Sequence, residues 1–270
     1  MSAVSRLDRR LAELAGRGRK ALVPFITAGD PGLDATVPVM HALVDAGADL
    51  IELGVPFSDP MADGVVIQKS SERALARGLT TPGLFALVAE FRQRDADTPV
   101  VLMGYLNPIE RRGWEWYAAQ AAQAGVDALL IVDLPPEEAA DARAVLNRHG
   151  LQLISLLAPT TEGARLREAC AQAQGYLYYV SMAGVTGTGL QHADDLRQRV
   201  ESIRAAAGVP VLVGFGIKDA ATARACAGFA DGVIVGSALV SVLAACDGPS
   251  AAAEAARAFL APLRAAVDPA

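Results

Sequence analysis

Eight short apolar runs, each followed by a stretch with helical character, constrain the fold of this chain more than any other feature of its sequence. The runs are rich in β-branched residues and nearly free of polar ones, which is typical of parallel strands buried on both faces. They span residues 22–26, 50–53, 100–103, 128–132, 151–157, 176–180, 211–213 and 232–235.

The alternation of strands and helices predicts right-handed crossovers and a parallel sheet. Eight such units in about 250 residues fit a closed (β/α)8 TIM barrel, which we expect to form a single domain over residues 1–270. An extra N-terminal helix is expected over residues 4–14, and extra helices at the C-terminal end, over the Ala-rich residues 251–266. A doubly wound open sheet is the alternative. It would be favoured by a GxGxxG turn after the first strand, which this sequence lacks.

A glycine recurs where three of the predicted helices give way to the next strand. Gly47, Gly125 and Gly228 are each followed within three residues by an aspartate and an apolar run. We expect each of these glycines to stop its helix in the left-handed conformation, which glycine adopts without steric cost.

Charge and composition restrict the possible partners. The 270 residues include 30 acidic and 24 basic ones, a net charge of −6 that argues against a nucleic-acid partner but permits a small anionic ligand. No apolar run approaches the roughly 18 residues of a membrane span, and the first residues lack a signal-peptide block, so we expect a cytoplasmic protein without a membrane association. Three cysteines without metal spacing fit a reducing compartment: Cys170, Cys226 and Cys246.

The spacing of the strands indicates where chemistry is to be sought. Strand starts lie mostly 21–28 residues apart, but 50 residues separate the second start from the third and 35 the sixth from the seventh. In a barrel, active sites lie on the loops that follow the carboxyl ends of the strands. The long loops after the second and sixth strands are therefore the first candidates.

Three side chains in these regions are candidates for catalysis. Glu52 lies inside the second apolar run, where burial would raise its pKa toward values that suit proton transfer, although a structural ion pair would also explain it. Asp63 lies in a loop rich in Pro and Gly, where Asp59 is the more typical turn residue, and simple turn chemistry is the alternative for both. Tyr178 shares a strand face with Tyr176 and could face a ligand or simply fill the core.

Glycine clusters at residues 184–189, 214–216 and 236–237 follow three successive strands. Such clusters let a phosphate approach backbone N–H groups, although tight turns also need glycine. A metal site is not expected, because no ligand spacing connects His41, His149 and His192. None of the lysines lies inside a predicted strand, which disfavours a Schiff base at Lys20, Lys69 or Lys218.

A long block at residues 45–64, with shorter blocks from about residue 21 to 240, matches the pattern of a known family. By these blocks the chain resembles the tryptophan synthase alpha chain family. The resemblance implies a (β/α)8 barrel that cleaves indole-3-glycerol phosphate to indole and glyceraldehyde 3-phosphate. It also implies no cofactor in this chain, and an alpha2beta2 complex with a beta chain that carries pyridoxal phosphate and joins indole to serine.

The resemblance also implies roles for individual residues. Glu52 and Asp63 match the catalytic acids, and Tyr178 an active-site tyrosine. The matching phosphate-binding residues are Gly187, Gly216, Gly236 and Ser237. Thr186 matches the threonine that bonds the aspartate, and the substrate pocket further includes Phe25, Met103, Leu130 and Phe215. Two positions depart from the common family pattern, Val65 for proline and Met182 for arginine.

Three other functions stay open on the sequence. The chain could be a regulatory subunit that only activates its beta partner, a stand-alone lyase, or another phosphate-binding barrel enzyme such as a sugar isomerase. We also expect residues 183–191 to be mobile without ligand, because a glycine-rich loop must open to admit substrate and close to exclude water.

Overall fold

The computed structural model describes residues 4–180, 190–214 and 216–268, with the backbone alone for 190–193. Eight parallel strands close into a barrel in chain order, which confirms the predicted (β/α)8 fold and excludes the open sheet. The strands are β1 (Ala21–Thr27), β2 (Ile51–Gly54), β3 (Val100–Gly104), β4 (Ala128–Ile131), β5 (Gln152–Leu157), β6 (Leu177–Val180), β7 (Val211–Gly214) and β8 (Gly232–Val235).

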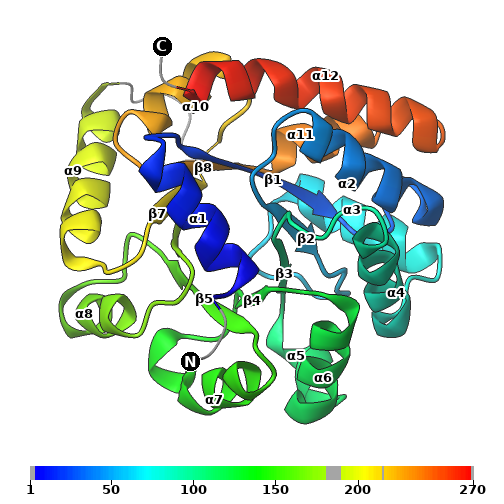
Figure 1. The fold of residues 1–270 in the computed structure, drawn as a ribbon, viewed down its shortest axis with the longest axis horizontal. Coiled ribbons are helices and arrows are strands. Elements are labelled where there is room, and N and C mark those ends of the chain that lie inside the picture. Colours follow the sequence, from blue (N-terminus) through cyan, green and yellow to red (C-terminus); the bar gives the residue numbers. More distant parts are fainter. Residues whose placement is uncertain (1–3, 181–189, 215, 269–270) are drawn as a thin grey trace.

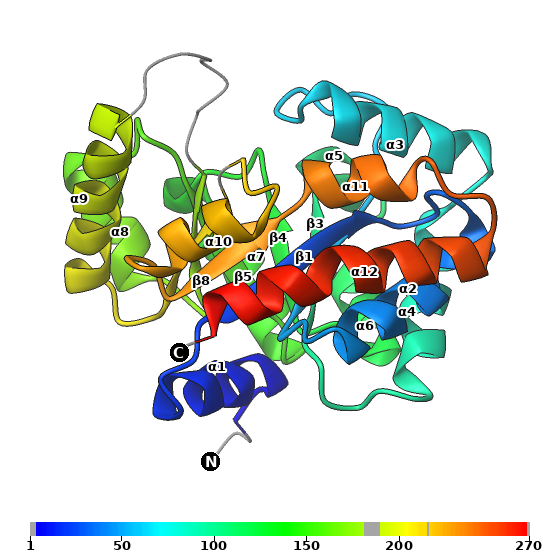
Figure 2. The same cartoon turned by 90° about the horizontal axis from the view of Figure 1, so that it is seen from above.

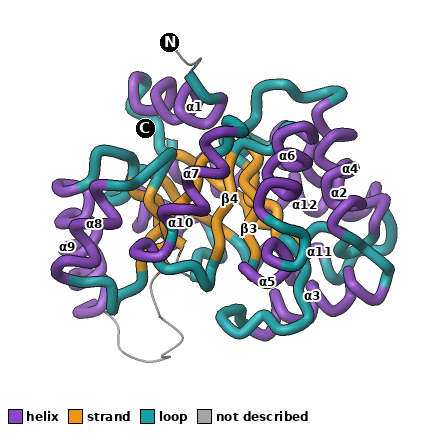
Figure 3. Tube along the Cα trace, turned by 90° about the horizontal axis from the view of Figure 1, so that it is seen from below, coloured by secondary structure: helices purple, strands orange, loops and turns teal. Residues whose placement is uncertain are grey.

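Helices surround the barrel on all sides (Figure 1, Figure 3). The long gap after β2 holds two of them, which explains the wide spacing of the strand starts there. The helices are α1 (Arg6–Gly16), α2 (Thr36–Asp45), α3 (Val65–Ala76), α4 (Thr81–Arg92), α5 (Leu106–Glu110), α6 (Trp114–Ala124), α7 (Ala140–Arg148), α8 (Gly163–Ala171), α9 (Leu190–Ala206), α10 (Ala220–Ala227), α11 (Ser237–Leu243) and α12 (Pro249–Val267). Within the described ranges, no helix is both long enough and apolar enough to cross a membrane.

Side chains alternate between two cores along each strand, as the pleat requires. On β2, Ile51 and Leu53 face outward and pack with the surrounding helices, whereas Glu52 between them faces the barrel interior. The interior is filled by apolar and aromatic side chains from several strands, among them Tyr176 and Tyr178. A carboxyl group therefore lies in an otherwise apolar interior.

The predicted extra helices are present at both ends of the chain. Helix α1 covers the end of the barrel opposite to α3 and α11 (Figure 2), and its residues Leu7, Leu11 and Leu14 join the apolar cluster of the barrel interior. Helix α12 lies along α2 and α10, and Arg264 near its end pairs with Asp49 at 2.6 Å. Helix α1 thus covers the amino ends of the strands, and the carboxyl ends, where barrel enzymes carry their active sites, lie on the other side.

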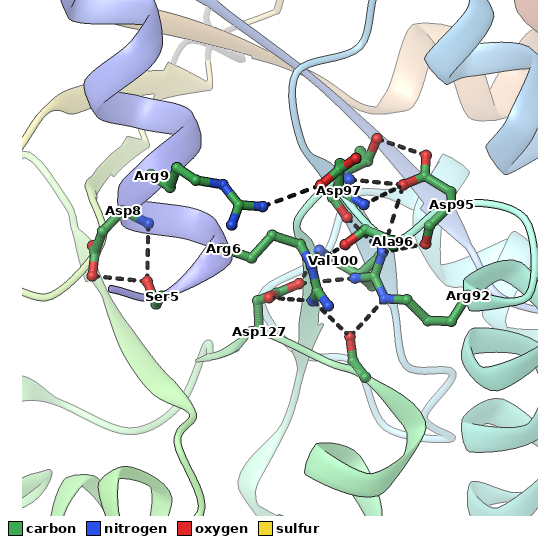
Figure 4. A network of polar contacts seen from close by, with 12 residues as sticks. Ser5, Arg6, Asp8, Arg9, Arg92, Asp95, Ala96, Asp97, Val100 and Asp127 are labelled. Carbon is green, nitrogen blue, oxygen red and sulfur yellow. Dashed lines mark hydrogen bonds and ion pairs between the residues drawn. The ribbon is translucent and has the colours of Figure 1, made fainter. Parts of the chain in front are cut away.

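A buried ion network holds α1 in this position (Figure 4). The Asp127 carboxylate, just before β4, accepts from Arg6 of α1 at 2.6 Å and from Arg92 of α4 at 2.9 Å. It also accepts from the backbone N–H of Val100 at 2.8 Å. Burial lowers the pKa of the Arg92 guanidinium to about 10, and the Asp127 charge opposes that shift. The network therefore depends on Asp127.

Replacing Asp127 with alanine is expected to lower the free energy of unfolding by about 3–5 kcal/mol, because it leaves the buried Arg92 charge without its main partner. Urea unfolding followed by circular dichroism measures the change. The control is Asp97→Ala, which removes the exposed Arg9–Asp97 pair of the same region and is expected to cost at most about 1 kcal/mol. Equal losses in the two variants would contradict a specific role of the buried network.

Candidate active site

A cavity of about 430 Å³ opens where the strands β1, β3, β6, β7 and β8 end. Its polar lining, within the described part of the chain, includes Asp63, Tyr178, Lys218 and Ser237. The apolar lining includes Phe25, Ile67, Met103, Val132, Leu156 and Ile234. An apolar chamber with a few convergent polar groups is the usual form of a small-molecule site.

Glycines at two strand ends make room for the aromatic walls of this cavity. A Cβ atom on Gly214 would lie 2.1 Å from the Tyr178 hydroxyl oxygen, and one on Gly54 would lie 2.5 Å from the Phe25 ring. Both contacts are far too close for real atoms. Any larger residue at either position would displace the aromatic ring beside it.

Glu52 is completely buried in the barrel interior. Its Oε1 atom accepts a hydrogen bond of 2.5 Å from the Tyr176 hydroxyl, and its Oε2 atom has no partner among the described residues. Loss of solvation raises the pKa of this carboxyl to about 7, although the Tyr176 hydrogen bond opposes the shift. Near neutral pH Glu52 can therefore both give and take a proton.

Tyr178 belongs both to the barrel interior and to the cavity wall. Burial is the main reason that the pKa of its phenol is raised, and the charges of Glu52 and Asp63 add to the shift. Tyr178 lines the cavity, whereas Tyr176, two residues earlier and on the same interior face, donates its hydroxyl to Glu52.

Asp63 ends the loop between β2 and α3 and is held there by several contacts. Its backbone carbonyl accepts from the Gln68 side chain at 2.7 Å. The Tyr105 hydroxyl, which lies on the same side of the loop, accepts from the Ala62 N–H at 3.1 Å. Burial raises the pKa of Asp63, and the nearby Tyr105 hydroxyl opposes the rise. Asp59 of the same loop is exposed and accepts from its neighbour Ser58 instead, so the structure separates two aspartates that sequence spacing could not.

The structure brings together most of the residues predicted for the site. The predicted residues that line the common cavity are Phe25, Asp63, Met103, Tyr178, Gly216, Gly236 and Ser237. Leu130 is buried inside the barrel and, like Glu52, is not among the described lining residues. Thr186, Gly187, Phe215 and Met182 lie outside the described residues, and so does most of the 183–191 segment for which mobility is expected. Val65 begins α3 and is exposed.

Two residues of the site were missed or only partly considered in the sequence analysis. Tyr105, which contacts the Asp63 loop, follows β3 directly, and its position at a strand end was the signal that could have identified it. Lys218 was weighed only as a Schiff-base lysine, yet it lines the cavity. Over the described ranges, no group of three or more His, Cys, Asp or Glu side chains is arranged to hold a metal ion.

Comparison with known proteins places this site in a family. Residues 11–268 match the family model described as the tryptophan synthase alpha chain. The chain belongs to the tryptophan synthase alpha chain family. The resemblance seen in the sequence is thereby confirmed. Members of this family cleave indole-3-glycerol phosphate, so the chain is a lyase of tryptophan biosynthesis.

Individual tryptophan synthase alpha chains resemble this chain over almost their whole length. One from Xanthomonas oryzae pv. oryzae is 62% identical over 264 residues, which cover 97% of this chain and 98% of that protein. One from Xanthomonas campestris pv. campestris is 58% identical over 272 residues, with 98% and 99% covered. The crystal structure of the alpha subunit from Legionella pneumophila superposes with a TM-score of 0.91 at 45% identity, covering 98% of this chain and 99% of that one.

Proposed function

We propose that Glu52 and Asp63 carry out the retro-aldol cleavage of indole-3-glycerol phosphate in this chain. Support comes from one observation above all: Asp63, Tyr178, Gly216, Gly236 and Ser237 line one cavity, and the fully buried Glu52 is hydrogen-bonded to Tyr176, two residues before Tyr178. A single ligand would then meet both acids, which have different surroundings, and also the glycine-lined rim. Such a pair of carboxyl groups can divide the acid and base tasks of one reaction.

Cleavage of the bond between indole C3 and the glycerol chain requires three events. A proton must be added to C3, the positive charge that develops on the ring nitrogen must be stabilised, and the proton of the side-chain hydroxyl must be removed. Protonated Glu52 gives its proton to C3 and then takes the hydroxyl proton, so it ends in the form in which it began. Ionised Asp63 accepts the indole N–H and stabilises the cation.

The remaining residues hold the substrate. By resemblance to the family, Gly187, Gly216, Gly236 and Ser237 bind the phosphate, Phe25, Met103, Leu130 and Phe215 surround the indole ring, and Thr186 bonds the aspartate; of these, Thr186, Gly187 and Phe215 lie outside the described residues. Glu52 is hydrogen-bonded to Tyr176 rather than placed on the described cavity wall. To reach indole C3, the Glu52 side chain has to leave the Tyr176 hydroxyl and turn toward the cavity.

The proposal extends to the partner and the compartment. The chain works in the cytoplasm as a single-domain alpha subunit of an alpha2beta2 complex, and indole passes to a beta chain. Pyridoxal phosphate is bound by that beta chain and not by this one. The barrel itself needs only its own carboxyl groups for the proton transfers described above.

An assay of the isolated chain tests the proposed function. We expect it to release indole and glyceraldehyde 3-phosphate in equal amounts from indole-3-glycerol phosphate, and to do so faster when a tryptophan synthase beta chain is added. Absorbance of indole and coupled oxidation of the triose phosphate give the two rates. No cleavage with or without the beta chain would favour a purely regulatory subunit, whereas full activity without any response to the beta chain would favour a stand-alone lyase.

A further inference from the structure

The charges on the cavity wall are few. Among the described lining residues, Asp63 is the single acidic side chain and Lys218 the single basic one. Asp63 faces the site from the loop after β2, whereas Lys218 follows β7, two residues after Gly216. The basic residue therefore belongs to the glycine-lined rim.

The backbone at Lys218 is fixed and its N–H group is occupied. This N–H donates to the Thr222 hydroxyl at 3.2 Å. The next residue, Asp219, caps α10 and accepts from the backbone N–H of Thr222 at 2.8 Å. Because the amide is already engaged, the group that Lys218 offers to an anionic ligand is its side-chain ammonium.

The ammonium of Lys218 has no carboxylate partner in the described structure. None of the ion pairs formed there includes it. The segments outside the description contain no Asp or Glu side chain either. By contrast, Lys20 at the opposite end of the barrel donates to the Ala230 carbonyl at 2.7 Å. Lys218 is thus a cation on a cavity wall that is left to pair with a ligand.

The geometry points to Lys218 as a phosphate-binding residue of the active site, whose ammonium pairs with the dianionic phosphate of the substrate. This inference rests on the proposed function. Backbone N–H groups supply only partial charges, whereas an ammonium supplies a full one, which matters in a chain with a net charge of −6. Lys218 would therefore favour the phosphate ester over the same molecule without its phosphate.

Binding of sn-glycerol 3-phosphate, measured by isothermal titration at low salt and at about 0.3 M salt, tests the assignment. Lys218→Gln is expected to weaken binding about 5–20-fold at low salt and to flatten the dependence on salt. Lys218→Arg is expected to restore most of the affinity. In the lyase assay, most of the loss in kcat/KM should come from KM. Lys69→Gln, an exposed position on α3, is the control with the same change in net charge.

Two outcomes distinguish the inference from the function on which it rests. If the wild-type chain cleaves indole-3-glycerol phosphate but Lys218→Gln binds glycerol phosphate as tightly as Lys69→Gln, the Lys218 assignment is overturned and the proposed function stands. If the wild-type chain neither binds glycerol phosphate nor cleaves the substrate, both are overturned.

Discussion

The Glu52→Gln variant is expected to lose about 10²–10⁴-fold in turnover, the usual contribution of a positioned acid or base. Glutamine has nearly the same shape and can still accept the hydrogen bond from Tyr176, but it has no proton to give to indole C3. Steady-state release of indole measures the loss. Binding of glycerol phosphate should be retained, because Glu52 is not on the rim that holds the phosphate. Turnover near the wild-type rate would remove Glu52 from the reaction.

The pH dependence gives an independent test of the same residue. Glu52 must be protonated when the reaction begins, and its pKa is about 7, so kcat/KM of the wild-type chain should fall as the pH rises through that value. The Glu52→Gln variant should not show this fall of kcat/KM at alkaline pH. An unchanged alkaline limb in Glu52→Gln would mean that another group titrates there.

The same pKa has a consequence for stability, which separates loss of chemistry from loss of folding. The pKa of Glu52 rises from 4.5 to about 7 on folding. The folded state thus holds this proton more tightly, and the stabilisation present below pH 4.5 is lost as the pH rises through 7. At alkaline pH, the free energy of unfolding of Glu52→Gln should therefore exceed that of the wild type by up to about 3 kcal/mol. The gain should be smaller at acidic pH. Urea unfolding at the two pH values measures both.

The Asp63→Asn variant is expected to lose a similar part of its turnover, about 10²–10³-fold, because a neutral amide cannot stabilise the cation on the indole nitrogen. The amide keeps the size of the carboxyl, so the loop between β2 and α3 should keep its shape. Indole release measures the loss, and retained binding of glycerol phosphate shows that the cavity is intact.

Asp59→Asn is the matched control for Asp63→Asn. It makes the same chemical change four positions earlier in the same loop, at an exposed side chain that contacts Ser58. Assayed without a beta chain, Asp59→Asn should turn over at close to the wild-type rate. Similar losses in both variants would mean that the loop as a whole, and not the Asp63 charge, accounts for the effect.

Strand positions could be predicted closely because burial on both faces leaves a clear mark in the sequence. The run at 50–53, for example, became β2 (Ile51–Gly54). The prediction that three glycines stop their helices in the left-handed conformation was only partly right. Gly47 and Gly125 have φ of 97° and 89°, but Gly228 has φ of −64° at the end of α10. One more residue separates Gly228 from its aspartate, so the chain can leave the helix there without a left-handed turn.

The site was harder to predict, because its contacts join residues from distant strands. The position of Glu52 inside a strand was enough to predict its burial and its raised pKa. Spacing could not decide between Asp63 and Asp59, because the difference lies in the folded loop: Asp63 lines the cavity, whereas Asp59 is exposed. Likewise, the helical period of α1 predicts a helix but not that Leu7, Leu11 and Leu14 seal one end of the barrel.

That helix also ties the segment that follows it to the end of the chain. Arg19, which follows α1, pairs at 3.0 Å with Asp268, which follows α12. Both described ends therefore lie away from the ligand cavity (Figure 2). A purification tag or a fluorescent reporter can therefore be fused at either end without covering the substrate entrance.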